Sequence, residues 1–202
     1  MQTWPTVRLL LPAVLGLGLA LASGAAADVF HSRESALRLA FPDADEVVPI
    51  DLILTEAEAD DVAERAGVEP ESRLVTAYEG RRGGHTLGWA FIDTHPVRSL
   101  PETLLLVVEP RGRVAATHLL AFHEPDEYRA PDRWFEQFRG LPLDGDLALG
   151  RAVAGIAGST LTSGAVTATV RRLLAVWQVK LAPPAVSERT ASADGPGSDH
   201  AS

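Results

Sequence analysis

Four runs of β-prone residues, joined by short segments, fill the middle of this sequence and restrict the folds open to it. The runs cover 74–78, 86–93, 103–108 and 114–122, with Arg-Arg-Gly-Gly after the first and Pro-Arg-Gly after the third. Strands joined by such short turns pair antiparallel, because a parallel crossover needs a dozen or more residues. The pattern therefore predicts one twisted antiparallel sheet.

Two amphipathic helices are predicted ahead of these strands. The stretch after Ser32 has apolar residues at helical spacing and stops at Pro42, with Ser32 as its N-cap. A second stretch opens with Thr55 and Glu58, which have the spacing of a capping box, and ends at Gly67, which suits a C-cap. Both helices therefore carry their own start and stop signals.

A longer helix is predicted over 163–181. Its apolar residues recur every three or four positions, namely Val166, Val170, Leu173, Leu174 and Trp177. A further strand is predicted over 46–54, and a short aromatic helix follows the last strand. Strands that pair antiparallel, with helices on one face of the sheet, make an α+β fold. The length of 202 residues, 46% of them hydrophobic, suffices for a single domain.

The first 27 residues have the pattern of an export signal. Arg8 precedes an apolar run over 9–22, and Ala25-Ala26-Ala27 before Asp28 is a small-residue cleavage site. The run has 14 residues, whereas a helix that crosses a bilayer needs about 20. We therefore expect a mature chain that begins near Asp28 and works outside the cytoplasm, in the periplasm. An uncleaved signal that anchors the chain in the membrane is the alternative.

Composition excludes several classes of protein. The sequence has no cysteine, which excludes disulfides, thiolate catalysis and iron–sulfur clusters. Its net charge is −9 and it has no basic stripe, so nucleic acid is not an expected partner. Residues 182–202 lack apolar periodicity and are rich in Ala, Ser, Pro, Gly and Asp, which predicts a disordered tail.

The segment 157–170, AGSTLTSGAVTATV, places six hydroxyl side chains just ahead of and within the start of the long helix. Glycine and small hydroxyl residues before a helix leave backbone N–H groups free, and the helix dipole favours a phosphate there. The same composition is typical of a helix start that is capped by Ser or Thr. On spacing alone, a capped helix start is the simpler interpretation.

These residues also resemble a known motif. Residues 156–166, IAGSTLTSGAV, resemble the S-G-A-T-[LIV]-T-S segment of the FMN-binding domain family, which includes the flavin-carrying G and C subunits of the Rnf and sodium-pumping NADH:quinone oxidoreductase complexes. The strand layout resembles that of the smaller exported members, so the resemblance covers about 30–181. It implies an FMN-binding domain over 28–181.

The resemblance also implies site residues. In that family a threonine is joined through a phosphoester bond to the phosphate of FMN, and Thr160 occupies the equivalent position. The implied cofactor-binding neighbours are Gly158, Ser159, Leu161, Thr162 and Ser163. His123 and Glu124 fall where larger relatives have a His-Glu segment near the flavin, and Trp134 is a candidate for stacking on the ring.

The function implied is that of an exported flavoprotein that relays electrons between membrane or periplasmic redox proteins, after a flavin transferase has attached FMN. The cofactor supplies the redox chemistry, and the protein holds and tunes it. No G-x-G-x-x-G lies between a strand and a helix, so partners, and not NADH bound to this chain, are expected to supply the electrons.

Three alternatives compete with this interpretation. Ala154 and Ala157 stand where the family has an aspartate and a serine, which favours a non-redox exported binding or assembly module that has kept the fold and lost the cofactor. A metal site at His118 and His123 fits no ligand template, so no metal is expected. A serine hydrolase would need a G-x-S-x-G elbow, which is missing, and no catalytic residue is assigned.

Overall fold

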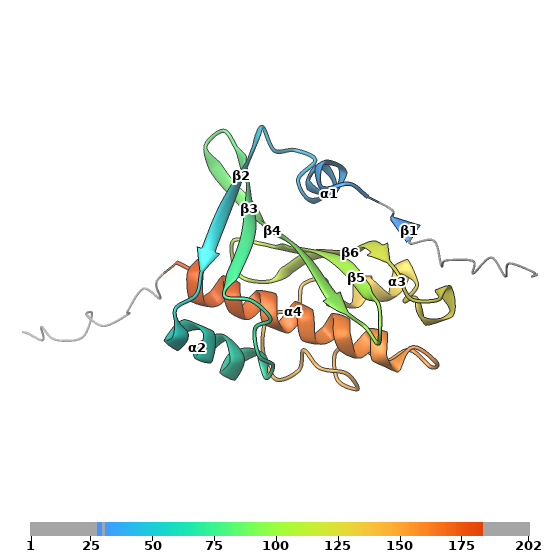
Figure 1. Ribbon diagram of the computed structural model, residues 1–202. Helices are drawn as coiled ribbons and strands as arrows, with labels where there is room; N and C mark the ends of the chain where they lie inside the picture. Colours follow the sequence, from blue (N-terminus) through green and yellow to red (C-terminus); the bar gives the residue numbers. More distant parts are fainter. Residues whose placement is uncertain (1–27, 30, 184–202) are drawn as a thin grey trace, which may run out of the picture.

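A six-stranded antiparallel sheet forms the centre of the protein in the computed structural model, which describes residues 28–29 and 31–183 (Figure 1). The predicted export signal, and 184–202 of the predicted tail, lie outside the described residues. The α+β class, the antiparallel sheet and the long C-terminal helix are confirmed. No helix in the described ranges is both long and apolar enough to span a bilayer.

The order of the strands adds one strand to each edge of the predicted sheet. It is β1-β6-β5-β4-β3-β2, so β2, with Pro49 in its middle, forms one edge and the two-residue β1 the other. The strands are β1 (Asp28–Val29), β2 (Glu46–Ile53), β3 (Leu74–Arg82), β4 (His85–Pro96), β5 (Pro101–Val108) and β6 (Val114–Phe122). Every neighbouring pair is antiparallel.

The β3–β4 hairpin is longer than the sequence pattern predicts, because the turn itself takes only two residues. Gly83 and Gly84 connect the strands with φ of 55° and 78°. Two consecutive residues with positive φ form a turn whose twist matches that of the flanking strands. The strands therefore continue through Arg82 and from His85, where the sequence pattern left a loop.

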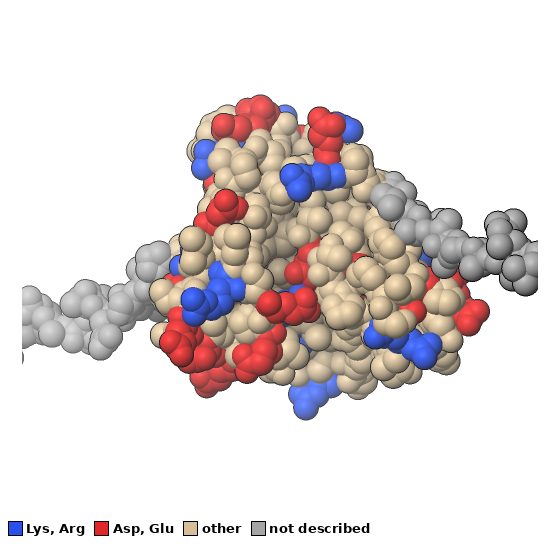
Figure 2. Space-filling view, viewed as in Figure 1, with Lys and Arg blue, Asp and Glu red and all other residues tan. Residues whose placement is uncertain are grey.

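Two helices cover one face of this sheet. The long helix α4 (Thr160–Lys180) packs against β4 and β5, and α2 (Glu56–Ala66) packs against α4 (Figure 1). The predicted apolar positions of α4 are all buried, from Val166 to Trp177. These residues belong to the larger of the two buried apolar clusters, so this face contains the main core. Burial of each Val or Leu side chain there contributes about 1.5–3 kcal/mol to stability. Acidic side chains gather on the outer surface of α2 (Figure 2).

The opposite face of the sheet also carries a helix. Helix α1 (Arg33–Ala40) lies there and packs Ala36 and Phe41 against Ala90, Leu105 and Leu120. This second core is smaller than the first. Its helix is nevertheless well defined, because the Ser32 hydroxyl caps it as predicted.

The predicted caps of α2 are also confirmed. The Thr55 hydroxyl accepts a hydrogen bond from the Glu58 N–H, and the Glu58 carboxylate accepts one from the Thr55 N–H at 2.8 Å. Gly67 closes the helix in the left-handed conformation at φ 72°. Arg171 of α4 then donates to the carbonyl oxygens of Ala66 and Leu147, which fixes the end of α2 on α4.

A short aromatic segment covers the end of the sheet near β6. It consists of the single turns η1 (Asp126–Tyr128), α3 (Asp132–Phe135) and η2 (Glu136–Phe138). Trp134 packs edge-to-face against Phe135 and Phe138, with ring centroids 5.3 Å apart in both pairs. Its indole N–H donates to the Ala154 carbonyl at 2.7 Å. The aromatic segment therefore fixes the loop that leads into α4.

Candidate functional site

The start of α4 is held on the chain beneath it by two hydroxyl groups. The Ser159 hydroxyl donates to the Glu127 carbonyl at 3.2 Å, and the Thr162 hydroxyl donates to the Tyr128 carbonyl at 2.6 Å. Both side chains are buried. A buried hydroxyl needs a partner, and here each partner is a main-chain carbonyl of the loop after β6. These two bonds fix where the helix begins.

Two further hydroxyls bond back into the helix itself. The Ser163 hydroxyl donates to the carbonyl oxygens of Ser159 and Thr160, both at 3.1 Å, and the Thr167 hydroxyl donates to the Ser163 carbonyl oxygen at 2.7 Å. Such bonds satisfy a polar group on a buried helix face. The interpretation of the segment as a side-chain-capped helix start is wrong, because Ser159 occupies the N-cap without any side-chain capping bond.

Thr160 differs from its neighbours. It is exposed, and no hydrogen bond from the described residues reaches its hydroxyl. The helix begins at Thr160 rather than at the predicted residue 163, so the N–H groups of 160–162 have no acceptor within the helix. The first helical N–H with an acceptor is that of Ser163, which bonds to the Ser159 carbonyl. An exposed hydroxyl and three N–H groups without a helical acceptor therefore lie together at the start of α4.

A pocket of about 210 Å³ lies against this surface. Five of its lining residues come from the segment and two from elsewhere, and together they are Gly158, Ser159, Thr160, Leu161, Thr162, Arg98 and Tyr128. The guanidinium carbon of Arg98 lies 4.9 Å from the centre of the Tyr128 ring, a cation–π contact. No carboxylate among the described residues pairs with Arg98. The pocket therefore has a positive charge that is free to meet an anion.

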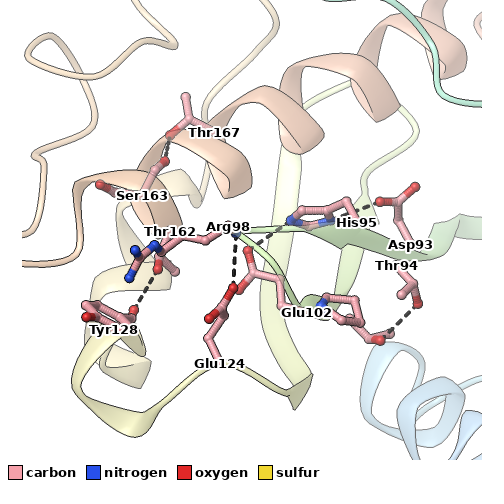
Figure 3. A network of polar contacts seen from close by, with 12 residues as sticks. Asp93, Thr94, His95, Arg98, Glu102, Glu124, Tyr128, Thr162, Ser163 and Thr167 are labelled. Atoms are coloured by element: carbon pink, nitrogen blue, oxygen red, sulfur yellow. Dashed lines mark hydrogen bonds and ion pairs between the residues drawn. The ribbon is translucent and has the colours of Figure 1, made fainter.

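The turn that carries Arg98 is fixed by Glu124. One carboxylate oxygen of Glu124 accepts hydrogen bonds from the N–H groups of Arg98, Ser99 and Leu100, at 3.2, 2.7 and 2.8 Å (Figure 3). The hydrogen bond from the Leu100 N–H, followed by that from Ser99, lowers the pKa of Glu124. Glu124 therefore holds the turn that carries Arg98, and it is not among the residues that line the pocket.

The remaining predicted neighbours of the cofactor lie away from the pocket. The His123 imidazole donates from Nδ1 to the Pro101 carbonyl at 3.1 Å, which ties the end of β6 to the start of β5. Trp134 is buried in the aromatic segment, and Ser163 is enclosed in α4. The structure thus brings together Gly158 and 159–162 at the pocket, and places Ser163, His123, Glu124 and Trp134 outside its lining.

The described histidines are not grouped with other metal-ligating side chains. Within 28–29 and 31–183 there is no group of three His, Asp or Glu side chains arranged to hold an ion. His118 lines a separate cavity of about 320 Å³ with Asp132 and Glu136, and burial lowers the pKa of His118. His123 is bound to Pro101 as described above.

A second polar cluster, the buried ion network, lies between β4, β5 and α4 (Figure 3). The His95 imidazole is 2% exposed and donates to Asp93 at 3.0 Å and to Glu102 at 2.9 Å. Arg172 of α4 donates to Asp93 at 2.9 Å and to Glu71 at 2.7 Å. Burial alone would lower the pKa of His95, but the two carboxylates raise it to about 9. His95 is therefore an imidazolium at neutral pH.

Sequence reasoning missed Arg98, Tyr128 and the buried ion network. A single arginine in a turn between two strands has no motif to mark it, and it reaches the pocket only through the β4–β5 hairpin. Asp93 and His95, two apart on one strand, do share a face and could have indicated a polar site. Their partners Glu102 and Arg172 follow from the fold alone.

Comparison with known proteins adds no assignment, since no family model matches the chain and no curated protein matches it.

Proposed function

We propose that this protein is an exported FMN-binding flavoprotein that relays electrons between membrane or periplasmic redox proteins, with FMN joined to Thr160 by a phosphoester bond. The proposal starts from the resemblance of 156–166 to the acceptor segment of the FMN-binding domain family. One structural observation carries it further. Within 159–163, Thr160 has the one hydroxyl that is both exposed and without a partner among the described residues.

This observation bears on which oxygen accepts the cofactor. Ser159 is the neighbouring candidate, but its hydroxyl is buried and bonded to the Glu127 carbonyl. Thr162 and Ser163 are buried and bonded as well. A flavin transferase needs an accessible oxygen to which it can attach the phosphate, and Thr160 presents one. The role that the resemblance implies for Thr160 is therefore chemically available to it.

The pocket at Thr160 fits the phosphate end of FMN. Its volume of about 210 Å³ lies below the range of about 300–1,000 Å³ that is usual for sites that enclose a whole ligand. The Arg98 guanidinium and the free N–H groups at the start of α4 are donors that suit phosphate oxygens. The exposed side chain of Leu161 borders the same pocket and offers an apolar surface beside the attachment point.

Other residues of the site would position Thr160 and Arg98 for the cofactor. Ser159 and Thr162 fix the helix start through their bonds to the loop after β6, and Glu124 holds the turn that carries Arg98. When bound, FMN supplies one- and two-electron redox chemistry that the side chains of this protein lack. A covalent bond keeps the cofactor on an exported protein, where a dissociated flavin would diffuse away.

The test is the intact mass of the mature protein after co-expression with an exported flavin transferase. We expect an increase equal to FMN minus one water, located by tryptic mapping on the peptide between Arg151 and Arg171, and a fluorescent band on a denaturing gel. Thr160→Ala should abolish the increase. Ser159→Ala is the matched control and should retain it, because Thr160 keeps its oxygen.

Two results would overturn the proposal. An unmodified mass, together with no flavin retained on the native protein, would favour the non-redox binding or assembly module. A mass increase that survives Thr160→Ala and disappears in Ser159→Ala would move the attachment to the other oxygen and contradict the assignment to Thr160.

A further inference from the structure

The sheet divides between β3 and β4. The two strands pair from their shared turn as far as Ala77 and Phe91. Beyond that point, 74–76 pair only with β2, and 92–96 pair only with β5. Figure 1 shows the two strands diverging, with β3 leading down from the hairpin toward α2 and β4 turning away. We call the space between the diverging strands the fork.

A cavity of about 320 Å³ occupies the fork. Its walls include the apolar side chains of Val75, Ile92, Leu173 and Val176, the last two from α4, which crosses beneath the sheet. The surface is visibly hollowed in this central region (Figure 2). The volume lies at the lower end of the range of about 300–1,000 Å³ for small-molecule sites. The fork cavity has room for a ligand of the size of an amino acid.

A carboxylate oxygen is available in this cavity. Asp93 lines it, and its hydrogen bonds from His95 and Arg172 both go to Oδ1. No hydrogen bond from the described residues reaches Oδ2, which points away from His95 (Figure 3). Burial would raise the pKa of Asp93, but His95 and Arg172 outweigh burial and lower it, so the group is ionised at neutral pH.

The opposite charge lies at the edge of the cavity. Arg33, the first residue of α1, lines it and is exposed, with no hydrogen bond or ion pair to any described residue. Arg172, by contrast, is 7% exposed, and its guanidinium group is already paired with Asp93 and Glu71. The cavity therefore presents carboxylate oxygens of Asp93 and Glu71 that no described residue bonds, and one free positive group, the Arg33 guanidinium.

We propose that the fork cavity binds a zwitterionic α-amino acid with an apolar side chain. The ligand ammonium group donates to Asp93 Oδ2, the ligand carboxylate pairs with Arg33, and the side chain lies along Val75, Ile92 and Val176. A simple cation would have its attraction to Asp93 offset by Arg33 and Arg172, and a simple anion would face Asp93 and Glu71. A ligand that carries both charges on neighbouring groups complements both kinds of side chain in the cavity lining. This site is separate from Thr160 and does not depend on flavin.

The experiment is a titration of the full chain with L-phenylalanine, followed by ¹H–¹⁵N NMR. Two matched compounds isolate the charges, since L-phenylalaninamide lacks the carboxylate and 3-phenylpropionate lacks the ammonium group. We expect shift changes centred on 74–76 and 92–94, and dissociation constants about tenfold or more higher for either analogue, because each loses a charged contact.

Variants test the two contacts in the protein. Arg33→Gln should weaken the binding of L-phenylalanine about tenfold. It should not weaken the binding of L-phenylalaninamide, because Arg33 repels this cation. Arg38→Gln, on the same helix but outside the cavity, is the control and should change neither. Asp93→Asn should abolish binding, but it also removes a charge partner from His95 and Arg172. The result for Asp93→Asn is used only if its NMR spectrum shows that the variant is folded. If it is not folded, the comparison of Arg33→Gln with Arg38→Gln tests the proposal alone.

Three results would overturn the proposal. They are the absence of shift changes at saturating L-phenylalanine, shift changes confined to residues outside the fork, and equal affinity for L-phenylalanine and both analogues. Equal weakening in Arg33→Gln and Arg38→Gln would also contradict it, because a general loss of positive charge would then explain the effect.

Discussion

The two polar regions that flank the β4–β5 turn use the same kinds of side chain in opposite ways. In the buried ion network, His95 and Arg172 each contact two carboxylates. In the pocket at Thr160, the hydroxyl and the Arg98 guanidinium are exposed and have no anionic or hydrogen-bonding side-chain partner among the described residues. The hydrogen bonds of the first region hold β4, β5 and α4 together and leave Asp93 Oδ2 as a free oxygen at its margin, whereas the second region leaves its hydroxyl and guanidinium groups free for a ligand. Location in a polar cluster therefore does not by itself indicate a binding site.

The largest expected effect comes from breaking the buried ion network. Glu102 is fully buried, and Glu102→Ala would leave the His95 imidazolium with Asp93 as its one carboxylate partner. Removing one partner of a buried ion pair costs about 3–5 kcal/mol. Urea denaturation should therefore show a loss of unfolding free energy of that size.

Asp61→Ala is the matched control for this change. Asp61 pairs with Arg65 on the surface of α2, with both side chains more than 40% exposed, and exposed pairs contribute about 0–1 kcal/mol. If both variants lose the same small amount, the buried ion network does not hold the strands to α4 as described.

The next effect is a dependence of stability on pH. The pKa of His95 is about 9 in the folded protein and about 6.5 when unfolded. Because the folded pKa is the higher one, the stabilisation is fully present below about pH 6.5 and is lost as the pH rises through about 9. The difference between the two pKa values corresponds to roughly 3–4 kcal/mol.

Urea denaturation at about pH 6 and about pH 10 measures this loss, with His95→Gln as the comparison for all other titrating groups. We expect the wild type to lose more stability than His95→Gln over this interval. Parallel losses in the two proteins would mean that His95 does not carry an elevated pKa.

A smaller difference in stability is expected between variants of Thr162 and of Thr160. Thr162→Val removes the hydrogen bond to the Tyr128 carbonyl and leaves that oxygen unpaired, which costs about 1–3 kcal/mol. Thr160→Val removes an exposed hydroxyl without a partner, so its stability should stay within about 0.5 kcal/mol of the wild type. Thermal denaturation measures both, and a larger loss for Thr160→Val would show that its hydroxyl has a structural role.

The smallest effect on stability is expected for Arg98→Gln. Arg98 stacks on the Tyr128 ring at an exposed position, a contact of about 0.5–1 kcal/mol. The effect of Arg98→Gln on phosphate binding should be much larger than its effect on stability. Titration with phosphate and ³¹P NMR should show weaker binding to Arg98→Gln than to the wild type, and equal binding would remove Arg98 from the pocket's function.

The strands and caps were predictable because their signals are local. Thr55 with Glu58, and Gly67 after the helix, specify α2 within a dozen residues. The runs of β-prone residues specify β3 to β6 in the same way. The sequence pattern also placed the apolar face of α4 correctly, because its spacing follows from the helix geometry alone.

The covering of the second face and the composition of the pocket were not predictable. Helix α1 reaches its face of the sheet because the chain between Phe41 and Glu46 passes beside the end of β3, where the Asp45 N–H bonds to the Arg81 carbonyl, and nothing in the helix itself indicates that face. The hydroxyls of Ser159 and Thr162 donate to main-chain carbonyl groups in a loop more than thirty residues earlier in the sequence. Such pairings depend on the tertiary fold, so the sequence alone suggested caps.

Pro49 in the outermost strand bears on how the protein behaves at high concentration. A strand at the edge of a sheet presents unpaired main-chain groups that another chain can join, which is a first step of aggregation. Proline has no N–H to offer, and Glu46 and Asp51 add negative charge along the same strand. A second molecule therefore meets an interrupted, charged edge at β2, and the sheet resists extension from one copy to the next.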